Sequence, residues 1–180
     1  MQRRRLLSWL SLSLSACASL PAAAPELLLR LPPAALGGRL ALVQQLHVWA
    51  GAREFEFQAL LEADPASLRL ALLAFAQPLA RLQWDGTTLT QQVAPGWPPA
   101  VSAERILSDL VLVLWPAGAV AAALPPGWSL QFDAAGRDLR WRGHLVQRVR
   151  YDNREHGRRV LLEHLGLGYR MQIDAQALAD

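Results

Sequence analysis

Apolar and polar residues alternate along most of the chain beyond residue 40, and a period of two is typical of half-buried β-strands. The clearest run is REFEFQALL at residues 53–61, where Phe55 and Phe57 share one face and polar side chains share the other. Asp85-Gly86, between two such runs, is a strong hairpin signal. The pattern predicts strands over residues 40–49, 53–61, 67–75, 79–84, 87–93, 128–132, 139–142, 145–151, 159–164 and 169–173.

A different period begins at residue 102, where apolar residues recur every three or four positions, as in an amphipathic helix. Ser102 is a good N-cap, Glu104 lies in the first turn where the helix dipole favours an acid, and Pro116 ends the helix. AGAVAAAL at residues 117–124 predicts a second short helix. The apolar side of the first helix consists of Ile106, Leu107, Leu110, Val111 and Leu114.

The predicted order is a group of strands, a pair of helices and a second group of strands. This order favours a mainly β fold of the α+β class. A single amphipathic sheet must bury its apolar face against another element. We therefore expect a curved antiparallel sheet that forms an incomplete barrel, with the helical insertion at about 102–124 packed in its mouth.

The first residues have the layout of a secretory signal. Three arginines at residues 3–5 precede an apolar run of 11 residues at 6–16, which is shorter than the roughly 20 residues of a membrane span. Cys17, the only cysteine of the chain, follows this run. We expect a signal peptide at 1–16, a Pro/Ala-rich tether at 17–38 and a single domain at 39–180. Alternatively, Leu27-Leu28-Leu29 docks on the domain.

Leu14-Ser15-Ala16-Cys17 resembles the lipobox of bacterial lipoproteins. The resemblance implies cleavage before Cys17 and acylation of its thiol and new amine, and several acyl chains anchor a protein stably. Ala18, in place of an Asp, implies the inner leaflet of the outer membrane, facing the periplasm. Two alternatives stay open. An ordinary signal peptidase would release a soluble chain, or Cys17 is a buried thiol of a cytoplasmic protein.

Charge changes the picture once the signal is removed. The chain has 18 basic and 15 acidic residues, and loss of the three signal arginines leaves 15 of each. This neutral balance does not support nucleic-acid binding. Residues 137–159 contain eight arginines and only three acids. This local excess predicts either a solvated face or a surface that contacts anionic headgroups or an acidic partner. The arginines proposed for that contact are Arg140, Arg142, Arg148 and Arg150.

No catalytic motif emerges from the sequence. The four histidines lack zinc-site spacing, and no GxSxG or complete dinucleotide fingerprint is present. Asp109, beside an apolar helical run, is either a buried acid or a group that lies on the polar side or hydrogen-bonds a strand. We therefore expect no enzyme activity, no metal site and no cofactor.

Apolar side chains are numerous enough to line a cavity as well as a core. Trp128 and Trp141 also sit in predicted strands and are either core or cavity wall. The residues predicted to line a hydrophobic cavity are Trp49, Phe55, Phe57, Leu70, Trp84, Leu107, Leu110, Leu114 and Trp115.

Several stretches resemble the LolA/LolB type of lipoprotein-handling protein. These are the lipobox, HVWAGAREFEFQALLEAD, LARLQWDGTTL and SAERILSDLVLVLWP. The resemblance implies a half-barrel whose apolar concave face receives acyl chains. A narrower likeness is to an uncharacterised family of small proteobacterial lipoproteins encoded among aryl-polyene genes, where Ala76-Gln77-Pro78 replaces an expected Gly-containing turn. The residues that fit this family's pattern are Leu82, Trp84, Asp85, Gly86, Asp109, Leu114, Trp115 and Pro116.

Two functions follow as expectations. The first is a carrier that takes an acylated or polyene-like molecule into its half-barrel and assists its insertion into the outer membrane, with the helix around Leu110 as a lid. The second is a structural adaptor lipoprotein with a filled core that binds an envelope protein. A large apolar cavity favours the carrier, and a tightly packed interior favours the adaptor.

Overall fold

The computed structural model describes residues 24–95, 97, 101–155 and 157–178. Its ten strands form one antiparallel sheet in the order β5-β4-β3-β2-β1-β10-β9-β8-β7-β6. The strands before the helices are β1 (Leu40–Ala50), β2 (Arg53–Ala63), β3 (Leu68–Ala74), β4 (Gln77–Trp84) and β5 (Leu89–Val93). Those after the helices are β6 (Trp128–Phe132), β7 (Gly136–Trp141), β8 (His144–Arg154), β9 (Gly157–His164) and β10 (Tyr169–Ala177).

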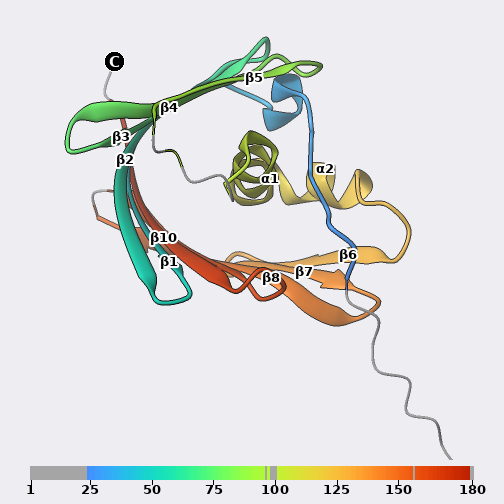
Figure 1. The fold of residues 1–180 in the computed structure, drawn as a ribbon. Helices are drawn as coiled ribbons and strands as arrows, with labels where there is room; N and C mark the ends of the chain where they lie inside the picture. The colour runs from blue at the N-terminus through green and yellow to red at the C-terminus, as the bar shows by residue number, and fades with distance from the viewer. Residues whose placement is uncertain (1–23, 96, 98–100, 156, 179–180) are drawn as a thin grey trace, which may run out of the picture.

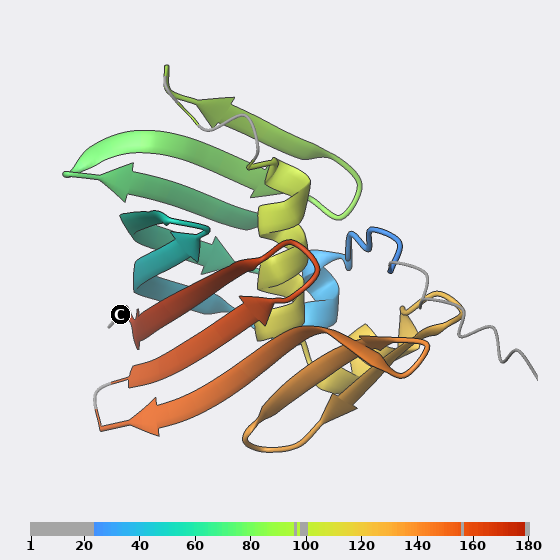
Figure 2. The same ribbon diagram turned by 60° about the horizontal axis from the view of Figure 1, so that its bottom comes forward.

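The sheet curves around two helices without closing into a barrel (Figure 1). Helix α1 (Ala103–Leu114) lies on the concave side and runs across the strands, as Figure 2 also shows, and α2 (Ala117–Ala122) follows it. The edge strands β5 and β6 are not paired with each other. The predicted fold class, an incomplete antiparallel barrel with a helical insertion in its mouth, is confirmed.

Alternation along the strands produces the core. In β2, Ala59, Leu61 and Ala63 are buried on the concave face, whereas the residues between them are exposed. Helix α1 supplies Val111 and the residue after its end, Trp115, both fully buried. Burying a large apolar side chain contributes about 1.5–3 kcal/mol. The interior between sheet and helix is therefore a packed core.

Helix α1 begins as its sequence predicts. The Ser102 hydroxyl accepts a hydrogen bond from the Arg105 backbone N–H at 3.1 Å, which satisfies one of the free donors of the first turn. The helix ends before Pro116, which cannot donate the next backbone hydrogen bond. These two signals set the length of the helix across the sheet.

The segment before β1 packs against α1 instead of leaving the domain. Leu29 and Leu31 are buried, and the Leu29 backbone N–H donates to Ser108 Oγ at 3.0 Å. The indole N–H of Trp84 donates to the Leu31 carbonyl at 2.9 Å, and that of Trp115 donates to the Pro32 carbonyl at 3.0 Å. Residues 24–36, which end in the short 3-10 helix Pro33–Leu36, therefore pack on the domain. This agrees with the alternative in which Leu27-Leu28-Leu29 docks there, and not with a tether over these residues.

The two ends of the sheet have different turns. At one end Asp64, Asp85 and Asp133 each accept hydrogen bonds from the turn backbone, and Asp85-Gly86 forms its predicted hairpin. At the other end, Phe75 and Ala76 join β3 to β4 with φ of 49° and 61°. Glycine and asparagine are the usual residues of such a turn, so this hairpin is strained.

The described elements form a single structural unit. All ten strands and both helices share one core that lies within residues 24–178, so a chain beginning at residue 18 keeps every contact described above. Within the described residues, neither helix has the length and apolar character needed to cross a membrane.

Candidate functional site

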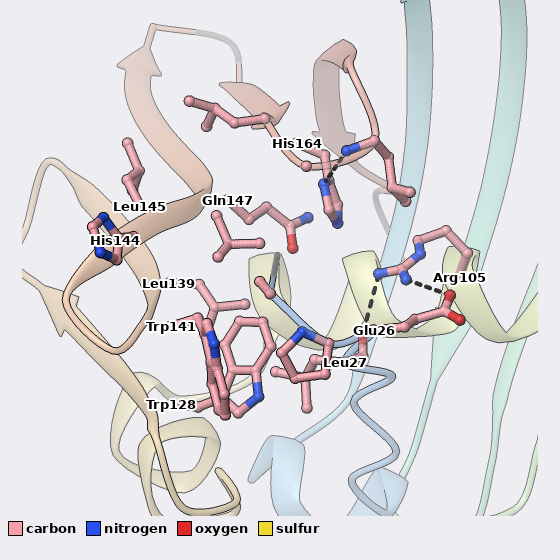
Figure 3. Close-up of a pocket in the computed structure, with 16 residues that line it drawn as sticks. Glu26, Leu27, Arg105, Trp128, Leu139, Trp141, His144, Leu145, Gln147 and His164 are labelled. Atoms are coloured by element: carbon pink, nitrogen blue, oxygen red, sulfur yellow. Dashed lines mark hydrogen bonds and ion pairs between the residues drawn. The ribbon is translucent and has the colours of Figure 1, made fainter. Parts of the chain in front are cut away.

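A pocket of about 540 Å³ opens at the end of the sheet where the β7–β8 and β9–β10 turns lie (Figure 3). Its volume falls within the range of about 300–1,000 Å³ that is usual for small-molecule sites. Three parts of the chain build it: residues 24–27, the first turn of α1, and the ends of β6 to β9 with the loop after β9.

One half of the pocket wall is apolar. The ring centroids of Trp128 on β6 and Trp141 on β7 lie 5.3 Å apart at an angle of 49°, and Leu139 lies beside Trp141 (Figure 3). Leu145 also lines the pocket, next to His144. Antiparallel pairing of Trp128 with Trp141 places the two indoles opposite each other. This half offers a broad surface to an apolar chain.

The other half is polar and centres on Arg105, which projects from the first turn of α1. Its guanidinium donates to the Glu26 carboxylate at 2.7 Å and to the Leu27 carbonyl at 3.1 Å. The Arg105 side chain is only 12% exposed, whereas Glu26 is 65% exposed. A nearly buried cation thus faces the pocket with an exposed acid as its partner.

His164, at the end of β9, forms the opposite side of this polar half (Figure 3). Its Nδ1 accepts a hydrogen bond from the Leu167 backbone N–H at 3.1 Å, so the neutral ring carries its proton on Nε2. Burial, followed by the charge of Arg105, lowers the pKa of His164 to about 4. The imidazole is therefore neutral at pH 7, with an N–H on Nε2.

Behind the pocket wall, Asp109 on α1 is buried and tied to the sheet. Its two carboxylate oxygens accept hydrogen bonds from Gln147 Nε2 on β8 at 2.8 Å and from the Tyr169 hydroxyl on β10 at 2.5 Å. Burial raises the pKa of Asp109 to about 6, and the two hydrogen bonds and Arg105 act in the opposite direction. Both interpretations of the sequence were half right, because Asp109 is buried and also bonds strands.

Exposed apolar side chains occupy the turns at the pocket end. Leu165 and Leu167, which flank the pocket, are 54% and 56% exposed, and Phe75 at the β3–β4 turn is fully exposed. Consecutive antiparallel strands place the β1–β2, β3–β4, β7–β8 and β9–β10 turns at this same end. We call Phe75, Leu165 and Leu167 the apolar rim.

The residues predicted to line a cavity lie elsewhere, and none of the nine lines this pocket. Phe57 and Leu114 pack partly buried against the core. Phe55 is half-buried beside Phe57, with their ring centroids 6.1 Å apart. The buried core contains Leu70, Trp84, Leu107, Leu110 and Trp115.

Trp49 lies on the opposite, convex face of the sheet from the rest of that set. Its strand neighbour Leu46 is buried in the core, and the alternation of β1 therefore directs Trp49 outward. There its ring stacks on His47 at 4.0 Å, and the Arg170 guanidinium lies 4.4 Å from its centroid.

The arginines proposed for an anionic surface gather partly on one acid. Arg140, Arg148 and Arg150 all reach Asp138 on β7, at 3.2, 3.3 and 2.8 Å. Burial raises the pKa of the Asp138 carboxyl, but Arg148 and Arg150 outweigh it and hold the pKa below its usual value. Arg142 stands apart at the β7–β8 turn, where its guanidinium lies 5.1 Å from the centroid of the Trp141 ring. Three arginines around one acid leave a local positive charge.

The pocket was missed by the sequence prediction, although its parts carried signals. Arg105 is the first basic residue of the predicted helix, and His164 ends a predicted strand just before the Leu-Gly-Leu-Gly turn. Neither fact indicates that residues 24–27 complete the wall. Among the described residues, no cluster of three or more His, Cys, Asp or Glu side chains is placed to hold a metal ion. Cys17 lies outside the described residues.

Comparison with known proteins places this architecture in a defined family. No curated protein matches the chain in sequence. A family model described as "Protein of unknown function (DUF3261)" matches residues 41–177, which span the sheet from β1 to β10 and both helices. Because this match covers most of the chain, the protein belongs to the DUF3261 family.

Proposed function

We propose that this protein is a non-catalytic, lipid-anchored protein of the cell envelope that holds a hydrophobic or acylated molecule and assists its transfer into the outer membrane. The observation that carries the proposal is the pocket, with an apolar wall at Trp128 and Trp141 and a cationic end at Arg105. Such a site suits a molecule with an apolar chain, including an acylated or polyene-like one.

The place of the ligand differs from the place that the sequence suggested. Helix α1 fills the concave face of the sheet, and Leu107 and Leu110 are buried there. A ligand that occupies the end pocket needs no displacement of α1. Each CH₂ group that it buries contributes about 0.8 kcal/mol, so a few such groups against the indoles suffice for capture.

The position of the pocket also suits an exchange with a membrane. Residues 24 and 25 line the pocket, and six residues separate Cys17 from residue 24, so the two Cα atoms lie at most about 25 Å apart. An acylated Cys17 would hold the pocket and the apolar rim near the bilayer surface. Leu165, Leu167 and Phe75 then contact lipid, which accounts for their exposure at one end.

The second candidate is a structural adaptor that binds an acidic envelope protein. The cluster of Arg140, Arg148 and Arg150 around Asp138 favours it, because the cluster lies on the convex face and carries a local excess of positive charge. The packed interior is compatible with this role. An adaptor role would not require the pocket at the end of the sheet.

A fluorescent fatty acid tests the carrier. We expect residues 18–180 to bind it saturably, and Leu145→Glu, which places a charge on the apolar wall, to weaken binding at least tenfold. Leu60→Glu is the matched control, since Leu60 is exposed outside this pocket. Absence of uptake by the unsubstituted chain, or equal loss in both variants, contradicts the proposal.

A further inference from the structure

The guanidinium of Arg105 is nearly buried but is paired with an exposed carboxylate. Its side chain is 12% exposed, and a nearly buried charge needs a compensating anion or several acceptors. Its other oxygen partner, the Leu27 carbonyl, carries no charge. Asp109, one helical turn further along α1, uses both carboxylate oxygens on Gln147 and Tyr169. Within the described residues, Glu26 is therefore the only carboxylate that contacts Arg105.

Glu26 is a weak partner for such a cation. Its side chain is 65% exposed, and it reaches Arg105 from the start of the described chain rather than from a strand or a helix. Ion pairs with an exposed partner contribute little to stability, so another anion can replace this one with little loss. The requirement for an anion comes from Arg105 and is not specific to Glu26.

A second polar group faces the same space. His164 is 7% exposed, its Nδ1 is occupied by the Leu167 N–H, and its imidazole points into the pocket (Figure 3). Within the described residues, no hydrogen bond joins Nε2 to another residue, so its N–H can donate to a ligand in the pocket. Two donors of different elements thus converge on the polar half of the pocket.

The apolar half is continuous with these donors. Trp128, Trp141 and Leu145 line the same pocket as Arg105 and His164 (Figure 3). A ligand that satisfies both halves has one anionic head and an apolar chain. The planar guanidinium pairs with carboxylate or phosphate oxygens through two hydrogen bonds, and both heads therefore fit.

We propose that Arg105 and His164 Nε2 form the head-group site for an anionic amphiphile, and that the Glu26 carboxylate occupies this site as an internal stand-in until the ligand displaces it. The proposal rests on the function proposed above and names the class of its ligand. The chain of the amphiphile lies against Trp128 and Trp141. Release reverses the exchange, because Glu26 returns to Arg105 as the ligand departs.

Calorimetric titration of residues 18–180 with five probes tests the site. The probes are dodecanoate, dodecyl phosphate, dodecanol, acetate and inorganic phosphate. We expect the two charged amphiphiles to bind at least tenfold more tightly than dodecanol, a difference of about 1.4 kcal/mol. Acetate and inorganic phosphate alone bind far more weakly. Equal binding of free anions and amphiphiles overturns the assignment of an amphiphile.

Two substitutions distinguish the contribution of the anionic head to binding from that of the apolar chain. Arg105→Gln should weaken dodecanoate at least tenfold and leave dodecanol unchanged. Glu26→Gln should tighten dodecanoate about two- to fivefold, because it removes the internal competitor. Glu104→Gln is the matched control, since it removes an equal charge close to Arg105 in the first turn of α1, while the partner of Glu104 is Arg30 at 4.0 Å, outside the pocket.

The outcomes are distinct. A gain of affinity in Glu26→Gln cannot come from misfolding, so that variant keeps the test decisive even if Arg105→Gln is unstable. Equal binding of dodecanol and dodecanoate, or an equal gain in Glu104→Gln, overturns the head-group site and leaves the carrier intact. Failure of all three chain-bearing probes to bind overturns the carrier and this site together.

Discussion

Two buried titratable groups at the pocket wall should give the protein opposite responses to acid. The pKa of Asp109 is raised from 3.8 to about 6 by burial, so its ionisation opposes folding at neutral pH and this penalty is relieved as pH falls. The pKa of His164 is lowered from 6.5 to about 4 by burial, so its contribution to stability is intact above pH 6.5 and lost as pH falls toward 4.

The magnitudes follow from these pKa values. One pKa unit corresponds to about 1.36 kcal/mol, so moving from pH 7.5 to pH 4.5 relieves about 2 kcal/mol at Asp109 and removes about 2.5 kcal/mol at His164. The two effects nearly cancel. Acids with lowered pKa values keep their contribution at pH 4.5, which lies above their ordinary value of 3.8; they are Asp64, Asp85, Asp138 and Asp174.

The substitutions that separate the effects are Asp109→Asn and His164→Asn. The first removes the titrating carboxyl, and its amide still offers an acceptor and a donor to Gln147 and Tyr169. The second keeps an oxygen where His164 Nδ1 accepts from the Leu167 N–H. In the double variant, residues 109 and 164 should contribute almost no pH dependence to the free energy of unfolding.

Urea unfolding followed by tryptophan fluorescence measures the effect, since Trp115 is fully buried. Between pH 7.5 and 4.5, the unsubstituted chain should change little in its free energy of unfolding. Asp109→Asn should lose about 2.5 kcal/mol and His164→Asn should gain about 2 kcal/mol. Identical pH profiles for the two single variants, or a loss in both, would refute the reasoning about burial.

Three further predictions concern the fold. Replacing Phe75-Ala76 by Asn-Gly should raise the free energy of unfolding by about 1 kcal/mol, because these residues tolerate positive φ, while it weakens binding to anionic vesicles in a sedimentation assay. Trp84→Phe should lower stability by about 1–2 kcal/mol in urea and speed amide exchange at Leu31 and its neighbours, since the indole N–H no longer holds the Leu31 carbonyl. Gly136→Ala should lower the thermal midpoint and cost about 1–3 kcal/mol, because its Cβ would lie 2.3 Å from the Val149 carbonyl oxygen.

Local patterns were sufficient to predict the elements. The strand expected at 53–61 is observed as Arg53–Ala63, and the helix expected after Ser102 is observed as Ala103–Leu114. Alternation and capping are properties of neighbouring residues, which is why they are readable. The strand expected at 139–142 begins earlier, at Gly136, where a side chain would meet the backbone of β8 and only glycine fits.

The pairing of strands that are distant in sequence could not be predicted from local patterns, and the candidate site depends on that pairing. The pairing of β1 with β10 joins the two halves of the sheet, and it brings Tyr169 beneath Asp109. Residues 24–27 were assigned to a tether because prolines and alanines dominate there. Their docking depends on Arg105, and that of residues 29–32 depends on Ser108, Trp84 and Trp115, all of which are distant in sequence. Trp49 was placed among the residues of a hydrophobic cavity by its type, although its position in β1 directs it outward.

The central claim is that the pocket carries an amphiphile in the cell. Native mass spectrometry of the protein purified from a bacterial envelope tests it most directly, with Arg105→Gln and Glu104→Gln purified in parallel. The account predicts a co-purifying species with an acyl or polyene mass, retained in Glu104→Gln and depleted in Arg105→Gln. A ligand-free mass for the unsubstituted protein, together with no uptake of added dodecanoate, would contradict it and leave the arginine cluster around Asp138 as the next surface to test.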